Sequence, residues 1–82
     1  MKETIYTGPF EPMIISQTTG DVKTFASKRT FNDGLLCAYN YVAEQEDGEF
    51  EIVLINTRTR EAEHDQMMTP AKARIAKQNF FR

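Results

Sequence analysis

Two side chains of the types used in nucleophilic catalysis occur once each in the chain, Cys37 and His64. A thiol becomes an effective nucleophile when a neighbouring base such as histidine takes its proton. Cys37, however, stands between Leu36 and Ala38, where a lone cysteine typically acts as a small buried hydrophobic residue. No motif links it to His64. We therefore expect no catalytic residue and a protein that is not an enzyme.

Four side chains that often bind metal ions stand close together, at Glu61, Glu63, His64 and Asp65. Successive side chains of a strand point to opposite faces, so His64 would lie away from the three carboxylates. A shared ion needs its ligands to converge on one point. The four glycines are scattered along the chain, which excludes a glycine-rich phosphate-binding loop. We expect neither a metal nor another cofactor.

The acidic residues gather in one part of the chain. Residues 44–65 contain eight acids against Arg58 and Arg60, a net charge of −6, whereas residues 66–82 contain no acid and carry +4. The two segments could neutralise each other in the fold, or the acidic one could face a basic partner. The candidate partner-binding residues are the acids around Gly48, namely Glu44, Glu46, Asp47, Glu49 and Glu51.

The C-terminal segment combines cations with aromatic rings, a mixture that binds single-stranded nucleic acid through phosphate contacts and base stacking. The residues of this alternative site are Lys72, Arg74, Lys77, Phe80, Phe81 and Arg82. The net charge of −2 disfavours it, because nucleic-acid binding draws on an extended positive surface. The apolar residues of the segment could instead cover the core while its cations stay in solvent.

The first third of the chain is predicted to contain strands. Residues 1–12 are interrupted by glycine and proline, which favours an N-terminal arm or an edge strand. Residues 13–18 and 22–27 are rich in β-forming side chains and flank Gly20, which predicts a hairpin.

A helix over residues 31–46 is the best-supported element. Apolar side chains recur at helical spacing at Phe31, Leu35, Ala38, Tyr39 and Val42. The acids before Gly48 would then crowd the negative end of the helix dipole, with no cation near them in the sequence. Such a conflict between sequence and local physics tends to mark a functional site.

The second half of the chain predicts two strands and a second helix. Residues 50–56 are apolar on both faces, as in a central strand, and residues 61–66 indicate a polar edge strand. Thr69 and Pro70 are suited to begin a short basic helix in the segment 69–82. The order β-β-α-β-β-α predicts an α+β fold, with a small, mostly antiparallel sheet and the long helix packed on one face.

The length of 82 residues predicts one domain over 1–82. No run approaches the roughly 18 apolar residues of a membrane span, and the N-terminus lacks the apolar core of a signal peptide, so we expect a cytoplasmic protein. A substrate pocket would remove much of so small a core, which disfavours many enzymes.

The leading hypothesis is a protein-binding module, an inhibitor or adaptor whose acids meet a basic surface of a protein partner. In size, lone cysteine, architecture and acidic segment the chain resembles, in general character, small phage-encoded proteins that block host defence, anti-CRISPR proteins among them. The resemblance implies action in the host cytoplasm, with a nucleoprotein complex as one possible partner. The alternative is a small RNA- or DNA-binding protein that uses the C-terminal segment.

Overall fold

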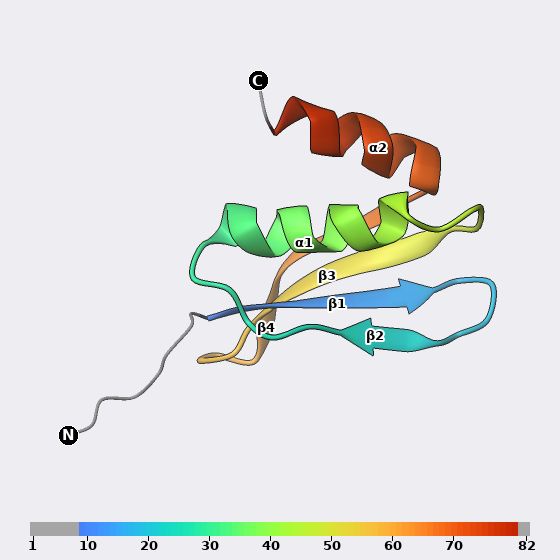
Figure 1. Cartoon of the computed structure of the whole chain (residues 1–82). Coiled ribbons are helices and arrows are strands. Elements are labelled where there is room, and N and C mark those ends of the chain that lie inside the picture. The colour runs from blue at the N-terminus through green and yellow to red at the C-terminus, as the bar shows by residue number, and fades with distance from the viewer. Residues whose placement is uncertain (1–8, 81–82) are drawn as a thin grey trace.

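The computed structural model describes residues 9–80, which form one four-stranded sheet and two helices (Figure 1). The elements are β1 (Phe10–Ser16), β2 (Val22–Thr24), α1 (Phe31–Ala43), β3 (Phe50–Asn56), β4 (Glu61–Met68) and α2 (Pro70–Asn79). Neighbouring strands are antiparallel, in the order β2-β1-β3-β4. The predicted fold class and element order are confirmed.

An arm or edge strand was predicted over residues 1–12. Residues 1–8 of this segment lie outside the described residues. Phe10 to Pro12 belong to β1, which is an inner strand paired with β3. The Pro12 carbonyl accepts from the Phe25 amide, and the Pro12 nitrogen faces the same side of β1. The three residues of β2 that pair with β1 are opposite Met13 to Ile15, so no β2 residue needs a hydrogen from Pro12. An inner strand thus contains a proline at a residue beyond the stretch that pairs with β2.

The predicted hairpin is present but its second strand is short. Gly20 lies in the turn with a φ of 82°, a left-handed conformation that glycine adopts without strain. β2 ends at Thr24. The chain then stays beside β1 through isolated backbone hydrogen bonds, including two between Lys28 and Phe10. The strand expected to continue to residue 27 is therefore only three residues long.

α1 begins as predicted and ends early. The Thr30 hydroxyl accepts from the Asp33 amide at 3.0 Å, which caps the first turn. The helix ends at Ala43 with Glu44 as its C-cap, not at residue 46. It must stop there because the chain crosses to the sheet within a few residues, where Phe50 is buried in the core. Gly48, with a φ of 109°, lies in this crossing and not directly behind the helix.

The core lies between α1 and one face of the sheet. The predicted contact of the helix stripe with β3 is confirmed, since buried residues of both elements form a single cluster: Ile14, Leu35, Ala38, Tyr39, Val42, Ala43, Phe50, Ile52, Leu54, Met68 and Ala73. Met68 joins this core because β4 runs two residues further than the predicted 61–66 and brings Met68 opposite Phe50.

α2 packs against α1, on the side of α1 that is turned away from β1 and β2 (Figure 1). Thr69 caps it by accepting from the Lys72 amide, and Pro70 occupies its first turn, as the sequence predicts. Neither helix of the described residues is long and apolar enough to cross a lipid bilayer.

Both helices lie on the same side of the sheet, so within residues 9–80 no helix covers the other side (Figure 1). We call this other side the open face. Val53 belongs to it, because its chain neighbours Ile52 and Leu54 point into the core and side chains alternate along a strand. Val53 is nevertheless only 6% exposed and lies between Met13 of β1 and Asp65 of β4.

Candidate functional site

The candidate acids lie mainly in the link between α1 and β3. We call residues 44–49 the acidic connection, and its four carboxylates, those of Glu44, Glu46, Asp47 and Glu49, are all exposed. Glu51 does not join them. It follows buried Phe50 and precedes buried Ile52, so alternation places its side chain on the open face. The structure therefore brings four of the five candidate acids together and separates the fifth.

A cation reaches the acidic end of α1 from a distant part of the sequence. Arg74 of α2 donates from Nε to the Ala43 carbonyl at 3.1 Å and from a terminal nitrogen to the Gln45 carbonyl at 3.0 Å. These bonds satisfy carbonyls that the helix end leaves without donors and offset the negative end of the dipole. No cation lies near this helix end in the sequence, and the cation is supplied instead by the neighbouring helix.

We expect the substitution Arg74→Met to lower the free energy of unfolding by about 1 kcal/mol. Methionine keeps much of the aliphatic length of arginine but removes both charge-assisted bonds, and the exposure of the side chain limits their value. Urea unfolding measures the loss. Lys72→Met, an exposed change on the same helix, is the control and should cost less than about 0.5 kcal/mol. Equal losses would contradict the capping role of Arg74.

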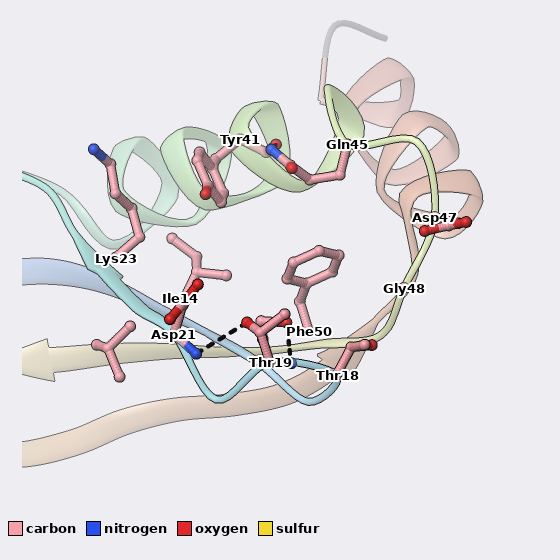
Figure 2. A pocket seen from close by; sticks show the side chains of 12 residues that line it. Ile14, Thr18, Thr19, Asp21, Lys23, Tyr41, Gln45, Asp47, Gly48 and Phe50 are labelled. Atoms are coloured by element: carbon pink, nitrogen blue, oxygen red, sulfur yellow. Dashed lines mark hydrogen bonds between the residues drawn. The ribbon is translucent and has the colours of Figure 1, made fainter.

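A cavity of about 560 Å³ adjoins the acidic connection, between α1 and the β1–β2 turn (Figure 2). Its apolar lining comes from Ile14, Val22, Tyr41 and Phe50, and its lining also includes Asp21 and Asp47. Aromatic rings beside carboxylates suit a cationic side chain, which gains both ion-pair and cation–π attraction. No sequence pattern indicates this cavity, because its lining comes from two segments, 14–23 and 41–50, that are separate in the chain.

The alternative nucleic-acid site loses two of its members to packing inside the molecule. Arg74 is bonded to α1, and the Phe80 ring packs edge-on against Tyr39 with centroids 5.6 Å apart. Lys72 and Lys77 remain on α2, while Phe81 and Arg82 lie outside the described residues. Phe80 thus follows the other interpretation of this segment, in which its apolar residues cover the core.

Cys37 and His64 have separate environments. Burial raises the pKa of the Cys37 thiol, and the nearby Lys28 only partly opposes this, so the thiol stays protonated at neutral pH. The His64 ring is hydrogen-bonded to Gln66 at 2.9 Å and packs edge-on against Phe31. Over residues 9–80, no three His, Cys, Asp or Glu side chains come together in a way that could hold a metal ion.

Two carboxyl groups meet on the open face. A hydrogen bond and the charge of Asp65 together raise the pKa of Glu51 from its usual value. The direction of this shift means that the two carboxylates repel each other once Glu51 is ionised. This repulsion makes a cation favourable beside them at neutral pH.

The arrangement defines a small α+β protein whose antiparallel sheet is covered by helices on one face and which carries an acidic connection beside a cavity. No protein-family model, curated protein or solved structure matches the chain.

Proposed function

We propose that the protein is a non-enzymatic binding module, an inhibitor or adaptor that blocks a basic surface of a partner protein. One observation carries the proposal. The side chains of the four acids in the acidic connection form no ion pair or hydrogen bond with any other residue in 9–80, so their charges are available to a partner. Exposed carboxylates concentrated at one end of a molecule speed the encounter with a basic protein and orient it.

The cavity supports the same proposal with a more specific contact. An arginine or lysine side chain of the partner would enter it, lie against the Tyr41 ring and approach the carboxylates of Asp21 and Asp47. The exposed acids would surround this anchor, in the way that polar residues surround the anchoring side chain of many protein interfaces.

A partner surface rich in arginine and lysine is typical of proteins that bind nucleic acid. We therefore favour an inhibitor in the manner of small phage-encoded anti-defence proteins, including anti-CRISPR proteins, acting in the host cytoplasm. Direct nucleic-acid binding is less favoured, because Arg74 and Phe80 are engaged with α1.

Reversing the charge of the acidic connection tests the proposal. The triple variant Glu46→Lys, Asp47→Lys, Glu49→Lys should keep its fold, because these exposed side chains have no partner among the described residues. Capture of the partner from cell lysate by the immobilised chain should fall by about tenfold or more. Circular dichroism and urea unfolding establish that the variant is folded.

The matched control reverses three other exposed acids, Asp33, Glu61 and Glu63, which changes the net charge equally but leaves the connection intact. This variant should capture the partner normally. Capture is repeated after nuclease treatment, and loss of the captured material would favour the nucleic-acid alternative. Undiminished capture by the first triple variant would refute the proposal.

A further inference from the structure

The open face of the sheet carries an apolar surface that the core does not use. On β1, Met13 and Ile15 alternate with buried Ile14, so they point away from the helices. The register extends this surface, because Met13 lies opposite Val53, and Ile15 lies opposite Val22 on its other side. Further apolar side chains on this face are those of Ile55 and Met67.

Parts of this surface are well exposed to solvent. Val22 is 57% exposed and Met67 is 45% exposed, and these two are among the three large hydrophobic side chains exposed in the described part of the chain. The third, Ile75, lies on α2 and is 61% exposed. Exposed large apolar side chains gathered on one face are typical of an interaction site.

The ionisable residues of the open face have a single sign of charge. Glu11 pairs with Ile55, Glu51 pairs with Ile15 and Met67, and Asp65 pairs with Val53. Lys23 is the one lysine or arginine within the four strands. It lies opposite Ile14 and therefore on the helix side of the sheet. The open face thus combines apolar side chains with carboxylates and has no cation of its own within its strands.

We infer that the open face binds an amphipathic basic helix of the partner protein, with apolar side chains against Met13, Ile15 and Met67 and with lysines or arginines beside Glu51 and Asp65. The inference rests on the proposed function for the partner being a protein, and it adds a second surface and the element that this surface recognises. α1 covers the helix side of the same sheet with 13 residues, so a helix of that length is enough to cover the open face.

Charge selects this occupant over a second copy of the chain. Two open faces in contact would bring Glu11, Glu51 and Asp65 of each copy toward the same acids of the other, with no cation from the strands to separate them. The repulsion between Glu51 and Asp65 already opposes further negative charge. Cations flanking an apolar helix stripe instead relieve that repulsion while the apolar side chains leave water.

A synthetic peptide tests the inference with the full chain. The peptide has the length of α1, leucines spaced on one helical face and lysines elsewhere. Nuclear magnetic resonance of the labelled chain should show saturable shifts of the methyl signals of Ile15, Val53 and Met67. A peptide with glutamates in place of the lysines should bind at least about tenfold more weakly, because the carboxylates of the open face repel it.

Variants of the open face give the matched comparison. The double variant Ile15→Thr, Met67→Gln keeps the charge but removes apolar groups of the open face that do not line the cavity, and it should weaken the lysine peptide about tenfold. The double variant Glu51→Gln, Asp65→Asn should weaken it by a similar factor. Ile75→Gln replaces an exposed apolar side chain outside the open face and should leave the affinity unchanged.

Several results would overturn the inference. One is unchanged affinity in both open-face variants, and another is an absence of methyl shifts on the open face. A third is loss of peptide binding only in the variant with reversed charges at Glu46, Asp47 and Glu49. That result would show that the peptide binds the acidic connection, and the proposed function would still hold. Sedimentation showing a dimer that Met67→Gln dissociates would identify a second copy as the occupant, and peptide binding that needs deletion of residues 1–8 would identify the chain's own segment. Lysate capture depends on the acidic connection and peptide binding on the open face, so each can fail alone.

Discussion

Replacing Leu35 by alanine is expected to lower the free energy of unfolding by about 2–4 kcal/mol. Leu35 is buried in the cluster that joins α1 to the sheet, and its removal leaves a cavity that rigid neighbours such as Ile52 and Leu54 fill only in part. So large a loss is a substantial fraction of the stability of a small domain. Urea unfolding followed by circular dichroism measures it.

Leu36→Ala provides the control for this prediction, because Leu36 is the next residue of α1 but is only partly buried and lies outside the core cluster. It should cost about 1 kcal/mol, in proportion to the smaller area removed from water. A loss below about 0.5 kcal/mol for Leu35→Ala would show that α1 does not pack on the sheet through this residue.

The substitution Gly34→Val is expected to destabilise the protein by about 2–3 kcal/mol through overpacking. Gly34 is buried in the first turn of α1, against β1 and β3. A Cβ atom at this position would lie 3.1 Å from a methyl carbon of Leu54 and 3.4 Å from the Cβ of Phe10. The further methyl groups of valine have no room unless the helix moves away from β1 and β3.

Asn32→Val is the matched control, since Asn32 is exposed in the same turn of α1 and both changes end in a β-branched side chain. Only the change at Gly34 should lower the unfolding midpoint in urea strongly. If the two variants unfolded at the same urea concentration, the close approach of α1 to the sheet would be refuted.

The element types could be predicted because local apolar spacing reflects burial directly. Leu35, Ala38 and Val42 recur at helical intervals, and each is buried against the sheet. The cap at Thr69 could also be predicted, since a capping side chain acts within three residues of its own position. Sequence patterns that span only a few residues are therefore enough to predict the fold class and the order of the elements.

Long-range contacts could not be read from the same patterns. Arg74 caps α1 from 31 residues away in the chain, which no local pattern indicates. Pro12 suggested an edge strand because proline lacks an amide hydrogen. It is enough, however, that β2 does not pair with β1 at this residue, on the side that the proline nitrogen faces. The cavity beside Tyr41 likewise depends on segments that meet only in the folded chain.

The candidate acids include residues that the sequence grouped correctly and one that it grouped wrongly. Glu46, Asp47 and Glu49 stay together because they are consecutive in one connection. Glu51 was grouped with them by sequence distance, although its position between buried Phe50 and Ile52 already places it on the opposite face of a strand. Alternation within residues 50–56 was sufficient to separate Glu51, and sequence proximity alone grouped it wrongly.

The attachment of α2 has a consequence for motion in the native state. α2 contacts α1 far more extensively than it contacts any strand, and Arg74 fastens it to the carbonyls of Ala43 and Gln45. A peripheral helix with this single main support opens by local unfolding at a lower free energy than the strands β1 and β3. We expect each such opening to withdraw Arg74 from the end of α1 and weaken its last turn, so the amide hydrogens of Glu44 and Gln45, which bond to that turn, should exchange with solvent in step with those of α2.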